Sequence, residues 1–336
     1  MMFSSFGDQA RTFMLSRQNA QLKTEMDRLS LELSSGRVAD TSKAVRGDFT
    51  GLSEIEEAAA SLGAYKTANS EAALFVENAQ SVLGFIQGLT GEAAPALLMA
   101  SNTNNNELVD ATTSDTKQKF ESVVSALNTQ TTGRALFSGR ATDTAALASV
   151  DDMLADLTPL LATETTAAGA LTVIDSWFDD AGGGFETIGY TGSQTTLSPF
   201  KIGPGREAHF EITAADPGIR GVLKGLAIAA LISEGTMSAF ASERQILLQS
   251  AGEALLSNEN EISGLRAATG TAEAHIDEMR VQNETEIHAL DLARTRVLGA
   301  DPYTAATELE AVQIQLETLY TVTARLSRLN LVDFLR

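Results

Sequence analysis

The sequence predicts a mainly α-helical protein whose two ends form long helices that pair with each other. Two observations support this: apolar residues recur with heptad spacing at both ends, and long stretches between them keep a helical period. A third is the change of pattern over residues 140–213, where short alternating runs indicate strands. We therefore expect long antiparallel helices with N- and C-terminal coiled-coil pairing, plus a small inserted α+β or β domain.

The first terminal helix is predicted from Leu15, where apolar residues begin to alternate at steps of four and three. Asn19 holds a polar place in this seam, and Gly36 is suited to a left-handed cap that ends the helix. About three heptads are marginal as an isolated helix in water, so this helix needs a partner. Its seam consists of Leu15, Leu22, Met26, Leu29 and Leu33.

The middle of the chain adds further helices around the insert. Helices are expected over residues 48–99, 109–130, 237–269 and 272–298, and Asp216-Pro217 provides a start signal for another helix that returns from the insert. Within the insert, we expect a short helix over 151–161 and strands over 185–190, 196–202 and 207–213.

The last helix mirrors the first. It begins near Tyr303, after a break at Gly299-Ala300-Asp301-Pro302, and Thr323 is a polar place in its seam. Since neither terminal stripe can be buried alone, the two helices are expected to pack on each other and on neighbouring copies. The seam of this helix consists of Leu309, Val312, Leu316, Leu319, Leu326 and Leu329.

These patterns divide the chain into three predicted domains. Residues 1–46 with 294–336 form a terminal coiled-coil assembly domain, 47–139 with 214–293 a helical core domain, and 140–213 an inserted domain. The two end segments together carry a charge of +2 and the middle −22. Near-neutral ends suit segments that pack against other chains, whereas an acidic middle suits a solvated surface.

Composition limits the possible functions. The chain has 336 residues and no cysteine, which excludes disulfides and thiolate metal sites. Its net charge of −20 repels phosphate backbones and anionic lipids, so neither nucleic acid nor a membrane is an expected partner. No apolar run reaches the roughly 18 residues of a membrane helix, and no cleaved secretory signal is recognisable at the start.

No group of residues indicates catalysis. His275 and His288 are thirteen positions apart, which on one helix points them in different directions, and His209 lies far away in the sequence. Asp151 and Asp152 are typical of a helix start, where acidic side chains interact favourably with the macrodipole. We therefore expect no catalytic, cofactor-binding or metal-binding residues and no enzymatic activity.

Several segments resemble the bacterial flagellin superfamily. Residues 29–37 (LSLELSSGR) are similar to the segment that ends the first flagellin helix, although Glu32 stands where a basic residue is usual, and residues 324–336 resemble the C-terminal helix. Residues 135–139 (ALFSG), Asp216-Pro217 and the turn at Asp301 resemble the hook-associated protein 3 family most closely. The resemblance covers somewhat over half of the chain.

The resemblance implies a structural subunit of the bacterial flagellum at the junction between hook and filament. Implied partners are other copies of the chain, hook-associated protein 1 on the hook side, flagellin on the filament side, and a cytosolic export chaperone at the C-terminal helices. It also implies an outward-facing insert and an extracellular location, reached through the flagellar type III apparatus without a cleaved signal peptide. Two alternatives stay open: a flagellin filament subunit, and a coiled-coil scaffold unrelated to flagella.

Overall fold

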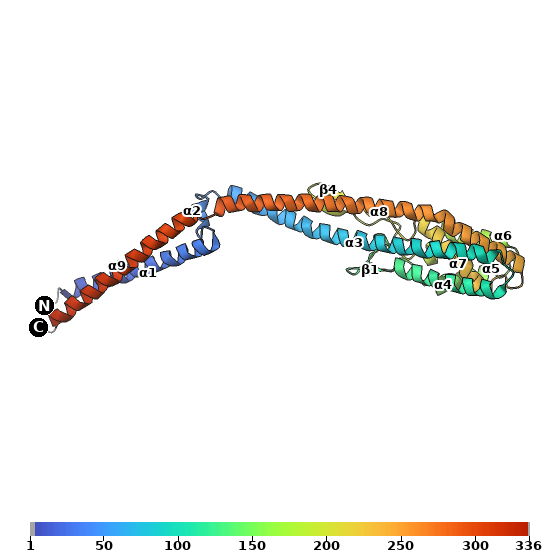
Figure 1. The fold of residues 1–336 in the computed structure, drawn as a ribbon, viewed down its shortest axis with the longest axis horizontal. Coiled ribbons are helices and arrows are strands. Elements are labelled where there is room, and N and C mark those ends of the chain that lie inside the picture. Colours follow the sequence, from blue (N-terminus) through green and yellow to red (C-terminus); the bar gives the residue numbers. More distant parts are fainter. Residues whose placement is uncertain (1–3, 335–336) are drawn as a thin grey trace. The chain divides into compact units, whose positions relative to one another are not determined.

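The computed structural model describes the backbone of residues 4–334 and the side chains of residues 10–326. The protein is mainly α-helical, as predicted, with two short antiparallel hairpins (Figure 1). It divides into two compact units: unit 1 is Met1–Gly63 with Thr285–Arg336, and unit 2 is Ala64–Glu284. The finer three-domain division stays a prediction.

Unit 1 contains two helices that lie side by side, α1 and α9 (Figure 1). Gly36, with a φ of +67°, ends α1, as the sequence predicts. The chain then pairs with the break between α8 and α9: Val38 N donates to Leu298 O at 2.8 Å, and Ala300 N to Gly36 O at 3.0 Å. The helices of unit 1 are α1 (Ser4–Ser35), α2 (Thr41–Ala44), the start of α3 (Thr50–Ser101), the end of α8 (Ala241–Leu298) and α9 (Pro302–Phe334).

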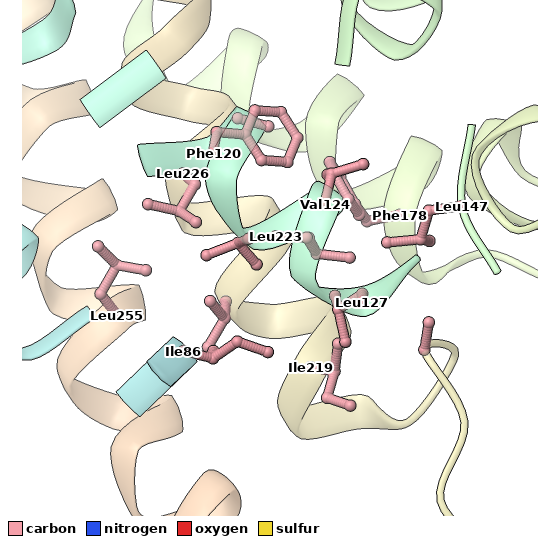
Figure 2. Close-up of a cluster of buried hydrophobic side chains, with 14 of the residues drawn as sticks. Ile86, Phe120, Val124, Leu127, Leu147, Phe178, Ile219, Leu223, Leu226 and Leu255 are labelled. Atoms are coloured by element: carbon pink, nitrogen blue, oxygen red, sulfur yellow. The ribbon is translucent and has the colours of Figure 1, made fainter. Parts of the chain in front are cut away.

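Unit 2 surrounds the hydrophobic helix α7 (Pro217–Ser233), which packs along α4 (Asn106–Leu127). Figure 2 shows the contact, with Phe120 and Val124 of α4 facing Leu223 and Leu226 of α7. All four side chains are at most 5% exposed. The remaining elements are β1 (Gln130–Thr131), β2 (Arg134–Ala135), α5 (Val150–Leu161), α6 (Ala167–Asp179), the π-helix η1 (Phe185–Gly189), β3 (Phe200–Gly203) and β4 (Arg206–Ala208).

The β3–β4 hairpin is fixed to the two longest helices by a pair of buried amides. Asn69 of α3 and Asn283 of α8 both donate to the carbonyl oxygen of Ile202, at 3.0 and 2.8 Å. Both side chains are buried, so each hydrogen bond satisfies a donor that would otherwise be costly to desolvate. The hairpin also places Phe200 against Phe75, with ring centroids 5.6 Å apart.

The structure corrects the expected strand over residues 185–190. Phe185–Gly189 is a π-helix, in which the Tyr190 amide donates to the Phe185 carbonyl at 2.6 Å. The reason is the aromatic cluster: Phe185 stacks on Phe178 at 5.6 Å and lies edge-on to Trp177, and a straight strand would not bring these rings together. The other two expected strands are confirmed only in part: β3 covers residues 200–202 of the first and β4 residues 207–208 of the second, and the rest of each is not strand.

Two helices also differ from expectation. The break expected near Gly270 is absent, and α8 runs without interruption because Ile262 and Ile276 are buried on either side of it. Helix α6 is not expected from the sequence at all.

Helix α3 contains an 18-residue segment that is long and apolar enough to span a membrane by length and composition, and 39% of this segment is buried inside the protein. The apolar runs in the sequence did not predict this segment.

Candidate assembly interface

The terminal helices meet through a small apolar cluster. Leu29 of α1 packs with Val312 and Leu316 of α9, and these three side chains are 1%, 8% and 6% exposed. Leu22, Met26 and Leu309 pack against them and are partly buried. Burying a leucine stabilises a contact by about 1.5–3 kcal/mol, so this cluster is the main source of α1–α9 pairing within one chain.

The other predicted seam residues differ in burial. Leu319 is 7% exposed, while Leu15 and Leu326 are half-buried. Leu33 is exposed at 42%, and the side chain of Leu329 lies outside the described residues. The structure thus brings the central seam residues together within one chain, and burial of the seam against a neighbouring copy stays a prediction.

Glu32 is buried beside the exposed Leu33. Its Oε1 accepts from Arg28 Nη1 at 2.7 Å and from the Ala39 amide at 2.9 Å, so the carboxylate ties the last turn of α1 to the segment that follows. Arg28 also donates to Glu25, which lowers the pKa of the Glu25 carboxyl, and lies 3.9 Å from Glu308 of α9. A charged contact therefore accompanies the apolar cluster at this level of the pair.

The start of α9 is capped by Asp301. Its carboxylate accepts from the Thr304 hydroxyl and from the Tyr303 amide, both at 3.0 Å, and these bonds lower the pKa of the carboxyl. Asp301 thus provides an acceptor for the Tyr303 amide, which has no partner within the helix. The helix start lies directly after the break at Gly299, as the sequence predicts.

The other half of the pair is open. A groove of about 530 Å³ runs between the first half of α1 and the last described turns of α9. Two seam positions in this half are polar, Asn19 and Thr323, and both side chains line the groove. Tyr320, beside them, is 50% exposed. This half of the pair is therefore not closed by its own side chains.

Apolar side chains also lie on the outer faces of both helices. Phe13 and Leu31 of α1 are 71% and 58% exposed, and Tyr303 and Ile314 of α9 are 81% and 57% exposed. Phe13 and Leu31 are eighteen residues apart, five helical turns, and lie about half a turn from the seam. The heptad pattern does not predict them, because the positions between them on this face include Arg17, Thr24 and Asp27 and so form no apolar stripe.

The predicted absence of metal-binding residues stays a prediction. Among the described side chains, no group of three or more His, Asp or Glu residues is arranged to hold a metal ion. His209 is exposed, 4.0 Å from Glu211, and His275 and His288 lie on α8.

Comparisons with known proteins agree with this architecture. Residues 243–335, most of α8 and α9, match the family model of the bacterial flagellin C-terminal helical region. A structure described as a flagellar hook-associated protein from Vibrio parahaemolyticus aligns with a TM-score of 0.53 and 16% identity, over 75% of this chain and 99% of the other. FlgL from Bacillus cereus aligns with a TM-score of 0.52 and 15% identity, over 72% and 100%. No sequence among curated proteins matches.

The C-terminal helices of this chain are therefore similar to those of bacterial flagellins. The chain has the fold of the flagellar hook-associated proteins, which confirms the resemblance seen in the sequence.

Proposed function

We propose that this chain is a subunit of the junction between the hook and the filament of a bacterial flagellum. One side of a ring of copies would bind hook-associated protein 1, and the other would present a surface on which flagellin adds. The observation that carries the proposal is the terminal helix pair, which has a small closed cluster, an open groove and exposed apolar outer faces. Such a surface becomes buried only when further subunits pack on it.

The role we infer is mechanical and not catalytic. A junction subunit adapts the curved hook to the filament, and it needs contact surfaces on several sides instead of a reactive site. Leu22, Leu29 and Leu316 would stay buried within each copy, and Phe13 and Ile314 would be covered by neighbours in the ring.

We further propose export through the flagellar type III apparatus to an extracellular position, without a cleaved signal peptide. A cytosolic chaperone would hold the C-terminal helices before export. The exposed Ile314, Tyr320 and Val322 of α9 support this part of the proposal, because they would need cover while the subunit waits in the cytosol.

Deletion of the gene tests the junction role. We expect intact hooks without filaments, and flagellin released into the medium, because flagellin is exported but finds no surface on which to assemble. Electron microscopy of the cells and immunoblotting of the medium measure both effects. Normal hooks with no flagellin anywhere would indicate that the chain is the filament protein itself, and unaltered flagella would contradict a flagellar role.

Limited digestion with trypsin separates this proposal from a scaffold unrelated to flagella. In the isolated chain, we expect cleavage at the exposed Arg11, Arg17 and Lys23 of α1 before any cut in unit 2, because so little of the terminal pair is buried. Mass spectrometry of the fragments over time gives the order of cleavage. A scaffold that is complete as a monomer predicts instead that the ends resist cleavage for as long as unit 2 does.

A further inference from the structure

The charges of the terminal helices are sorted along their length. In α1, residues 9–24 contain three basic and no acidic residues, whereas residues 25–35 contain three acidic and one basic residue. In α9 the order is reversed, with three acidic and no basic residues over 302–317, then two basic and no acidic over 318–332. Each helix thus has a basic half and an acidic half.

Pairing of α1 with α9 brings like halves together. Arg28 and Glu308 approach each other in the acidic halves, at 3.9 Å, while Arg11, Lys23 and Leu326 line the groove between the basic halves. The two helices therefore run in opposite directions, and their charges add. We call residues 9–24 and 318–332 the cation zone, and residues 25–35 and 302–317 the anion zone; they carry +5 and −5, and Asp8 and Asp333 flank the cation zone at its outer end.

Among the side chains that the structure describes, each zone keeps unpaired charges, although Arg28 pairs with Glu25, Glu32 and Glu308 of the anion zone. Arg11, Arg17, Lys23 and Arg325 of the cation zone are exposed, and none forms an ion pair with another described residue of unit 1. In the anion zone, the exposed Asp27, Glu310 and Glu317 are likewise without a described basic partner. Like charges thus accumulate at each end of one rod-like pair, which favours contact with a surface of opposite charge.

The complementary surface is present on the chain itself. A cation zone of +5 in a protein of net charge −20 is matched in size and length by the anion zone of a second copy. Apolar contact accompanies the charges, because Phe13 lies in the cation zone and Leu31 in the anion zone, both on the outer face of α1. Arg17 and Asp27, each four residues from one of these side chains, share this outer face, whereas Arg11 and Lys23 line the groove between the two helices.

We propose that neighbouring copies pack their α1–α9 pairs in a staggered arrangement, with the cation zone of one copy against the anion zone of the next. The centres of the two zones are separated by about 14 residues along α1, which corresponds to an offset of about 20 Å at the helical rise. Copies that run in the same direction and pack level with each other would instead place like charges together. The inference rests on the proposed self-assembly and specifies its register.

Two charge-reversed variants and their mixture test the stagger. The first variant carries Arg11→Glu, Arg17→Glu and Lys23→Glu, and the second carries Asp27→Lys, Glu310→Lys and Glu317→Lys. All six positions are exposed, and glutamate, lysine and arginine have similar helix propensities, so the helices should be retained. Circular dichroism checks this retention, and sedimentation with light scattering measures the concentration at which each sample assembles.

We expect each variant alone to require about tenfold higher concentration than wild type, because each then brings like charges together in the staggered contact. An equimolar mixture should assemble close to the wild-type concentration, since the acidic zone of one variant meets the basic zone of the other. Wild-type assembly should also weaken from 0.15 M to 1 M salt, as the Debye length falls from about 8 to about 3 Å.

A matched control carries the same change of charge in unit 2. Arg140→Glu, Lys201→Glu and Arg206→Glu replace three exposed basic residues, and assembly should match wild type. If this control weakens assembly equally, or if the mixture of variants fails to recover, net charge and not the stagger is responsible, and the inference is wrong. If wild type fails to assemble under any condition, the proposed self-assembly itself is wrong.

Discussion

Replacing Leu29 and Leu316 together by aspartate should abolish assembly while unit 2 remains folded. The two side chains are 1% and 6% exposed and belong to the one closed cluster between α1 and α9, so two carboxylates there would lose the apolar burial and repel each other. Loss of two buried leucines removes about 3–6 kcal/mol, which exceeds what the remaining partly buried contacts can replace. Sedimentation measures assembly, and thermal denaturation followed at Trp177 measures the stability of unit 2.

The control for this variant is Leu33→Asp, the same change one turn further along α1. Leu33 is 42% exposed, so the α1–α9 pair of the isolated chain should be retained, with unchanged helix content and tryptic cleavage order. If the Leu29→Asp, Leu316→Asp variant assembled at the wild-type concentration, the seam would be only an internal contact with no part in assembly.

Replacing Phe120 by alanine should lower the free energy of unfolding of unit 2 by about 3–5 kcal/mol. The ring is fully buried where α4 packs along α7, close to Leu223 and Leu226 (Figure 2), and the alanine would leave a cavity in its place. The single tryptophan of the chain, Trp177, lies in unit 2, so urea denaturation followed by its fluorescence reports on this unit alone.

A second phenylalanine provides the comparison. Phe85 lies on α3 in the same unit but is 47% exposed, and Phe85→Ala should change the free energy of unfolding by no more than about 0.5 kcal/mol. Equal losses for the two variants would mean that the α4–α7 contact is not the centre of the unit 2 core.

The seam and the long helices could be predicted from the sequence because their signals are local. A heptad row such as Leu15, Leu22 and Leu29 requires only a helical period, and Gly36 ends the same helix because glycine readily adopts a positive φ. The role of Asn69 could not be predicted in this way, because the Ile202 carbonyl that it binds lies 133 residues further along the chain.

Helix α6 has local signals that could have predicted it, because Thr166 caps its start and its buried residues keep a helical period. The π-helix η1 depends instead on how Phe185 packs on Trp177 and Phe178. The exposure of Leu33 depends on its neighbour Glu32, whose carboxylate is bound by the Ala39 amide. Ala39 lies beyond the end of the helix. A period along one helix contains no information about either arrangement.

The hydrogen-bonded crossing at Gly36 and Gly299 affects how the chain bears load. At this level, Val38 is bonded to Leu298 and Ala300 to Gly36, so the end of α1 and the break before α9 are joined side by side. Tension applied to either terminal helix is then divided between two backbone paths instead of following one. The break at Gly299 interrupts the helical hydrogen bonds and would therefore extend first under tension. The two hydrogen bonds to the end of α1 hold this break to a second segment of backbone.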